Sequence, residues 1–121
     1  MRTIDPDTAW NGIAALYADA SLERSLLRRQ DEENLDVVLH LFARWAASQG
    51  HALDADALAQ AEALVARWRA EVIAPLRALR RSMKTPAELA RREAVRDKVK
   101  AAELAAERAQ VQMLCEWLQA R

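Results

Sequence analysis

The residue types that most often carry chemistry are scarce and scattered in this chain of 121 residues. It has one cysteine, Cys115, and two histidines, His40 and His51, which are too few and too far apart for a structural zinc site. Asp36 and Arg44 each lie one helical turn from His40, as in a proton-transfer pair, but an exposed contact along one helix face explains this spacing better. We therefore predict no catalytic residue, no metal site and no cofactor.

Nucleophilic and phosphate-binding motifs are also missing from the sequence. The serines have no glycine-rich turn or neighbouring base around them, and two isolated glycines cannot form a dinucleotide fingerprint. The acidic residues at 31–36 could suggest a divalent cation, but they lack the second aspartate-rich helix of the helical prenyl-diphosphate enzymes. Helix capping and a solvated turn at residues 31–34 are the better explanation.

Basic residues gather in one part of a chain whose net charge is zero. Residues 67–100 hold eleven basic and four acidic side chains, whereas residues 1–66 hold five basic and eleven acidic ones. The segment 77–100 could bind a nucleic acid or another anion, although acidic residues interleave with it and no aromatic side chain is placed for base stacking. Pairing of the two charged halves within the fold is the simpler reading. The candidates for binding an anion or a partner are Arg77, Arg80, Arg81, Lys84, Arg91 and Arg92.

The composition determines the fold class that must position these groups. Ala, Leu, Arg and Glu dominate, with two glycines and three prolines, which favours helix and leaves little for strands. The length suits one domain, residues 1–121. No signal peptide and no apolar run of membrane-spanning length is recognised, so we expect an all-α cytoplasmic protein without membrane contact.

Apolar spacing and caps predict a bundle of about five helices. The first begins after an N-cap at Asp7 or Thr8 and ends near residue 18, and the second follows a cap at Ser21 and runs to residue 30. The third covers residues 35–49 and ends at Gly50. The fourth opens at Asp54 and runs to the turn at residues 82–84.

The last two helices are predicted to be long and to form an antiparallel hairpin. Pro75 lies inside the apolar stripe of the fourth helix, so we expect a kink there. Thr85, Pro86 and Glu88 match a capping box with proline at the first helical position, which starts the fifth helix.

The C-terminal helix carries two apolar stripes, more than one buried face needs. It either fills a groove of its own domain or meets a second subunit. The candidate oligomer face comprises Val111, Met113, Leu114, Trp117 and Leu118.

Three blocks of the sequence resemble a known family. They comprise Gln30, Asp31, Leu35, Asp36, Val37, Leu39, Leu41, Phe42 and Trp45, then Trp68, Arg69, Glu71, Val72, Pro75, Leu76, Arg77, Leu79, Arg80, Arg81 and Lys84, and then residues 99–108. In this order they resemble domain-of-unknown-function family 2390, a family of short proteobacterial proteins. The resemblance implies a small helical protein of the bacterial cytoplasm and supplies no activity. It suggests a shared polar network of Gln30, Asp31, Asp36, Arg69, Lys100, Glu103 and Arg108.

Three hypotheses about function remain open. The first is a non-enzymatic interaction or regulatory module with a protein partner, which could be a second copy of the chain. The second is a regulator that binds nucleic acid or an anionic ligand through the basic segment. The third is an apolar-ligand protein or enzyme with a pocket near Trp45 and Trp68. The alternative explanation for these two tryptophans is that both indoles pack in the core.

Overall fold

The computed structural model describes residues 4–83 and 89–121, which are entirely helical apart from turns. In chain order the elements are α1 (Pro6–Tyr17), α2 (Ala20–Glu33), α3 (Val37–Ser48), α4 (Ala55–Trp68), the π-helix η1 (Arg69–Ile73), α5 (Ala74–Ser82) and α6 (Leu89–Ala120). Because α4, η1 and α5 follow one another without a break, the described residues form five helical rods and no strand. The predicted all-α fold is confirmed.

Aspartates begin the first four helices, two of them at positions that differ from prediction. Asp5, not Asp7 or Thr8, caps α1, because proline at the first helical position is favoured and the Asp5 carboxylate accepts the Thr8 N–H. Asp19, not Ser21, caps α2 by accepting the Leu22 N–H. A carboxylate has two oxygens and a full charge to offer to the positive end of the helix, and here it prevails over the hydroxyl.

The predicted turn at residues 31–34 was too wide. Residues 31–33 belong to the last turn of α2, and Asn34 alone adopts the left-handed conformation, with φ of 55°. Asp36 then caps α3 through the Leu39 N–H, and Asp54 caps α4 through the Ala57 N–H, as predicted for Asp54. Gly50 follows α3 with φ of 86°, a conformation that glycine adopts without strain.

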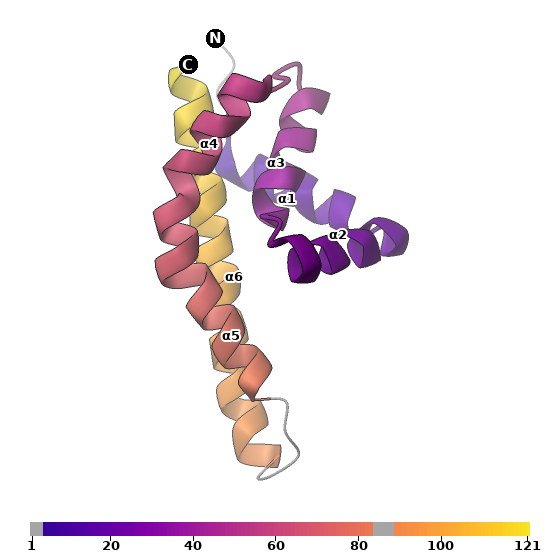
Figure 1. Cartoon of the computed structure of the whole chain (residues 1–121), viewed down its shortest axis with the longest axis vertical. Coiled ribbons are helices and arrows are strands. Elements are labelled where there is room, and N and C mark those ends of the chain that lie inside the picture. The colour runs from indigo at the N-terminus through magenta and orange to yellow at the C-terminus, as the bar shows by residue number, and fades with distance from the viewer. Residues whose placement is uncertain (1–3, 84–88) are drawn as a thin grey trace.

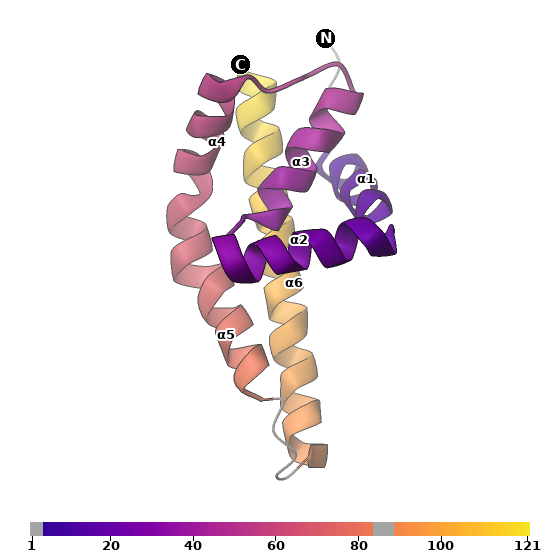
Figure 2. The ribbon, with the colours of Figure 1, turned by 45° about the vertical axis from the view of Figure 1, so that its right-hand side comes forward.

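The core forms where α1, α3 and α4 surround the second half of α6 (Figure 1). Its largest fully buried side chains include Phe42 of α3, Leu26 of α2, Val65 of α4, and Val111 and Leu114 of α6. We call α1, α2 and α3 together the N-terminal lobe. Figures 1 and 2 both show that α5 and the first half of α6 continue beyond this lobe, and we call that extension the arm.

The rod that contains Pro75 is a π-helix over the five residues before α5. The Ala74 N–H bonds to the carbonyl of Arg69, five residues back, and the next residue, Pro75, has no N–H to offer. The π-helix shifts the register of the backbone hydrogen bonds, and this shift costs least beside a proline, where one backbone hydrogen bond is already missing. The kink at Pro75 stays a prediction, as does the hairpin, and the capping box at Thr85, Pro86 and Glu88 lies outside the described residues.

Contacts between the last two rods follow an opposed order along the chain. Gln60 accepts a hydrogen bond from Arg121, the Trp68 indole N–H donates to the Ala106 carbonyl at 2.9 Å, and Arg80 pairs with Glu103. Later residues of the α4–α5 rod therefore meet earlier residues of α6.

Candidate functional site

Four charged side chains meet between α5 and α6. Arg77 and Arg80 lie one turn apart on α5, and Glu103 and Glu107 lie one turn apart on α6, so each pair shares a helix face. The Arg80 guanidinium donates to both oxygens of Glu103, at 2.5 Å from Nε and 3.3 Å from Nη2. Arg77 Nε lies 3.4 Å from Glu103, and Arg77 Nη2 lies 3.9 Å from Glu107. We call these four residues the α5–α6 charge cluster.

The two carboxylates of the cluster differ in how closely the guanidinium groups of Arg77 and Arg80 approach them. Glu103 is 5% exposed and faces both guanidinium groups at close range, a fork geometry that suits a buried carboxylate. Glu107 has only the longer contact with Arg77. Burial raises the pKa of Glu107 to about 7, and the neighbouring charge of Glu103 adds to this, against the opposing effect of Arg77 and Arg80.

A cavity of about 610 Å³ lies between the N-terminal lobe and the charge cluster. All four cluster residues line it, on the side formed by α5 and α6. Its apolar walls come from all three helices of the lobe and from α6. They comprise Trp10, Ile13, Ala14, Ala18, Leu27, Val37, Val38, Leu41 and Leu104.

Four more polar groups line this cavity: Tyr17 of α1, Glu23 and Gln30 of α2, and Lys100 of α6. Burial raises the pKa of Tyr17, and the charges of Glu23 and Glu107 raise it further. The cavity therefore has an apolar side and a side rich in charge, which is typical of sites that hold small organic molecules.

A second polar group ties α3, η1 and α6 together. The Gln110 side chain, fully buried, donates to Asp36 Oδ2 at 2.8 Å, while its own Oε1 accepts no hydrogen bond from the described residues. Arg69 donates to the backbone and side-chain oxygens of Asn34, and its Nε lies 4.0 Å from Asp36. Asp36, Arg69 and Asn34 line a separate cavity of about 670 Å³.

The predicted network residues fall into four places instead of one. Asp36 and Arg69 lie together, Glu103 belongs to the charge cluster, and Gln30 and Lys100 line the cavity beside it. Asp31 pairs with Arg81 at 2.6 Å, and Arg108 pairs with Asp7 at 2.7 Å while its guanidinium covers the Trp10 ring. Sequence reasoning missed Glu107, Gln110 and Asn34 as members of these groups. The signals for Glu107 were its place in the matching block 99–108 and its position one turn after Glu103.

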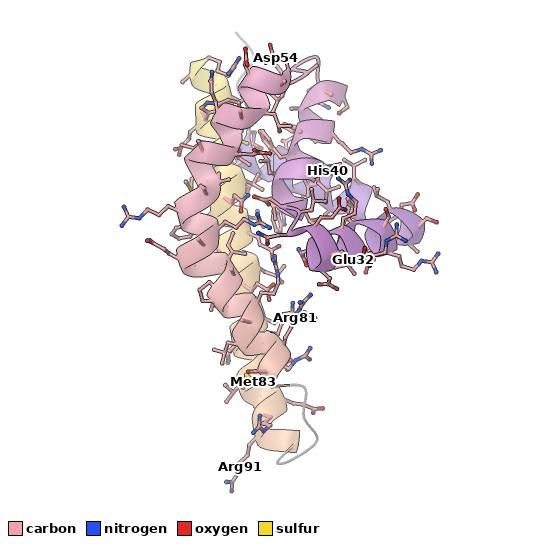
Figure 3. All side chains as sticks on the ribbon, in the orientation of Figure 1. Glu32, His40, Asp54, Arg81, Met83 and Arg91 are labelled. Carbon is pink, nitrogen blue, oxygen red and sulfur yellow. The ribbon has the colours of Figure 1, made fainter. Side chains whose placement is uncertain are left out.

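Three of the six predicted anion-binding residues pair with carboxylates of the same chain. Arg77 and Arg80 belong to the charge cluster, and Arg81 of α5 reaches across to Asp31 of α2. Arg91 lies at the far end of the arm (Figure 3). Arg92 lies on the next position of α6, and Lys84 lies outside the described residues.

The predicted oligomer face is occupied inside the chain. Val111, Leu114 and Leu118 are buried in the core, and Met113 and Trp117 are partly buried against it. Of the two uses weighed for this apolar surface, the structure places these side chains in the groove of their own domain.

The remaining candidate groups have structural surroundings. Trp45 is buried in the core, and the Trp68 indole N–H donates a hydrogen bond to the Ala106 carbonyl. Neither indole lines the 610 Å³ cavity, the 670 Å³ cavity or a third one of about 360 Å³. Burial raises the pKa of Cys115 to about 11, so the thiol is protonated near neutral pH. Burial and the charges of Arg29 and Arg44 lower the pKa of His40, which is half-buried.

Comparison with known proteins gives one match. The sequence profile of a family described as "Protein of unknown function (DUF2390)" matches residues 8–114. No curated protein and no solved structure matches the chain. In the described part of the chain, no helix combines the length and apolar character needed to cross a bilayer.

Proposed function

Since this chain belongs to the DUF2390 family, whose function is unknown, we propose a function from its geometry: it binds a small amphipathic molecule in the cavity beside the α5–α6 charge cluster. The bound molecule would place an apolar body against the N-terminal lobe and a polar head against α5 and α6. A molecule in this position would contact both the lobe and the α5–α6 side of the cavity, as a regulatory ligand of the chain would.

One observation carries this proposal, namely apolar side chains left exposed in the cavity wall. Leu27 and Leu104 are 36% and 47% exposed although both line the cavity. A ligand that covered them would gain the free energy of removing apolar surface from water. The volume of about 610 Å³ also lies within the range of roughly 300–1,000 Å³ that is common for small-molecule sites.

A neutral fluorescent dye tests this proposal. Ala14 is exposed on α1 and lines the cavity, whereas the adjacent Ala15 is exposed and does not line it. We expect Nile red to bind the chain with increased emission, and Ala14→Trp to weaken binding about tenfold by filling the cavity. Ala15→Trp, the matched control, should leave binding unchanged. Equal binding by the two variants, or no binding by the unaltered chain, would refute the proposal.

A second candidate function is self-association through the arm. Leu79 of α5 and Val95 of α6 are 49% and 53% exposed. Arg96 donates a hydrogen bond to the Arg80 carbonyl. Val95 and Leu79 are the chain neighbours of these two residues, so both lie in the same part of the arm. A second copy of the arm could cover both side chains, which makes the arm a better dimer surface than the buried face of α6.

Sedimentation equilibrium tests the second candidate. The mass should rise toward that of a dimer with concentration, and Val95→Asp should return it to the monomer value. A monomer mass at every concentration would exclude self-association and would leave the cavity proposal untouched.

A further inference from the structure

We propose that the ligand of this cavity is an amine with an apolar body, whose ammonium group pairs with the carboxylate of Glu107. This inference rests on the proposed function, because it assigns a chemical class to the molecule in the same cavity. The apolar body would lie along Trp10, Leu27 and Leu104.

The cationic groups of the charge cluster are already matched. Arg80 makes two hydrogen bonds to Glu103, and Arg77 contributes a third contact at 3.4 Å to the same carboxylate. An anionic ligand would have to displace the side chain of Glu103, which is buried and could not regain these contacts elsewhere. The cluster therefore offers little to a carboxylate or phosphate.

Glu107 is the member of the cluster with the most to gain from a new partner. Its contact with Arg77 is 3.9 Å, and its side chain is 19% exposed while it lines the cavity. An ammonium group can approach a carboxylate to about 2.8 Å and donate up to three hydrogen bonds. An ammonium group in the cavity would therefore give the Glu107 carboxylate a closer cationic partner than Arg77, which lies 3.9 Å away.

Charged and titratable groups from the lobe, α5 and α6 surround Glu107 or line the cavity with it. Glu103 of α6, Arg77 and Arg80 of α5, Asp36 at the start of α3 and Tyr17 of α1 are close enough to interact with its charge, whereas Glu23 of α2 and Lys100 of α6 line the same cavity. Glu23 and the hydroxyl of Tyr17 also line the cavity, so they offer further acceptors to an ammonium group bound there. Lys100 is exposed, so solvent screens its repulsion.

The ionisation of Glu107 should make the affinity of the cavity for an amine depend on pH. Because burial raises the pKa of Glu107 to about 7, a cation must drive off a proton in roughly half of the molecules at pH 7. An alkylammonium stays charged up to a pKa of about 10.4. Amine affinity should therefore rise about tenfold between about pH 6 and about pH 8, with proton release.

Isothermal titration with three matched probes tests this inference. Phenylbutylamine, phenylbutanol and phenylbutyrate share an apolar body and differ in the charge of the head. At about pH 8 we expect the amine to bind about tenfold tighter than the alcohol, and the carboxylate to bind weakest. At about pH 7, where about half of the Glu107 side chains are protonated, titration in buffers of different ionisation enthalpy should show proton release with the amine alone.

A matched pair of variants locates the amine at Glu107. Glu107→Gln keeps the shape of the side chain and removes its charge, so amine affinity should fall about tenfold while alcohol affinity stays the same. Glu116→Gln is the control, because Glu116 is exposed on α6 and does not line the cavity. Its amine affinity should equal that of the unaltered chain.

The outcomes separate this inference from the proposed function. Tighter binding of the carboxylate, or an amine affinity that Glu107→Gln does not change, would overturn the amine and leave the cavity as a binding site. Failure of all three probes to bind would overturn both.

Discussion

At the scale of single residues, Glu107 is held at a cost to the fold. Its carboxylate is desolvated between α5, α6 and the lobe, and the nearby charge of Glu103 disfavours ionisation. The folded chain therefore binds the Glu107 proton more tightly than the unfolded chain does. As pH rises from about 4.5 to about 7, the unfolded chain is ionised and the folded chain is not, so the free energy of unfolding falls.

Replacing Glu107 should remove this loss. We predict that Glu107→Gln raises the free energy of unfolding at about pH 8 by on the order of 2 kcal/mol, and changes it little at about pH 4. Urea denaturation at the two pH values measures the difference. Glu116→Gln, on the exposed side of the same helix, should show no such dependence. Equal stability changes at both pH values would contradict the raised pKa of Glu107.

Glycine is required at position 12 because α1 and α3 approach each other closely there, not because the chain turns. It lies inside α1, where a Cβ atom would overlap the ring atoms Cδ1 and Nε1 of Trp45 on α3. Glycine costs about 1 kcal/mol relative to alanine in a helix, but here the missing Cβ lets the two helices meet.

The usual gain from Gly→Ala should therefore be reversed at this position. We predict that Gly12→Ala lowers the free energy of unfolding by about 1–3 kcal/mol, because Trp45 must shift in a packed core. The neighbouring Asn11 is exposed on the same helix, so Asn11→Ala should be neutral or slightly stabilising. Thermal unfolding followed by circular dichroism compares the two, and a stabilising Gly12→Ala would show that the approach is looser.

At the scale of elements, α5 is joined to α6 by charge more than by apolar burial. It contributes no buried side chain among the described residues, whereas α3 contributes seven. Its main contacts with α6 are those of Arg77 and Arg80 with Glu103. The ion pairs are partly buried and less screened by solvent, so the two partners should be coupled more strongly than a pair on the surface, while desolvation offsets part of the net gain in stability.

A double-mutant cycle measures this contribution. We predict a coupling free energy of about 1–3 kcal/mol between Arg80→Ala and Glu103→Ala. The exposed pair Arg67 and Glu71, also joined by an N–O contact, should give less than about 0.5 kcal/mol. A coupling no larger than that of the exposed pair would mean that packing alone holds α5 in place.

Sequence patterns predicted the elements better than their ends. The helices of residues 37–48 and 55–68 follow from apolar spacing, and Asp54 stood alone as a cap before α4. At α1 and α2 several residues of similar capping ability compete, and the local geometry that selects Asp5 and Asp19 is not visible in spacing. The π-helix could not be predicted, since its register depends on how α4 and α5 both meet α6.

The candidate site was predictable in part. Arg80 and Glu103 were both named as candidates, because charged residues at helical spacing in a matching block suggest shared contacts. Their pairing, and the position of Glu107 beside them, depends on which turn of α6 meets which turn of α5. The cavity itself is lined by helices as far apart in the chain as α1 and α6. A local sequence pattern does not predict that two such distant helices meet.

At the scale of the whole molecule, α6 connects the lobe to the arm. Its second half supplies Val111, Leu114 and Leu118 to the core, and its middle supplies the two carboxylates of the charge cluster. The cavity lies at the junction of these two parts, because side chains of α1, α2 and α3 and side chains of α5 and α6 line it together. A molecule bound there would touch α1, α2, α3, α5 and α6 together.

The tryptophan indole signals in a two-dimensional ¹H–¹⁵N spectrum test this account most directly. The chain has four tryptophans, of which Trp10 lines the cavity and Trp117 lies near the far end of α6. On titration with phenylbutylamine, the indole signal of Trp10, assigned with Trp10→Phe, should shift in a saturable way while that of Trp117 stays in place. A stationary Trp10 signal at saturating probe would contradict the claim that this cavity is a binding site.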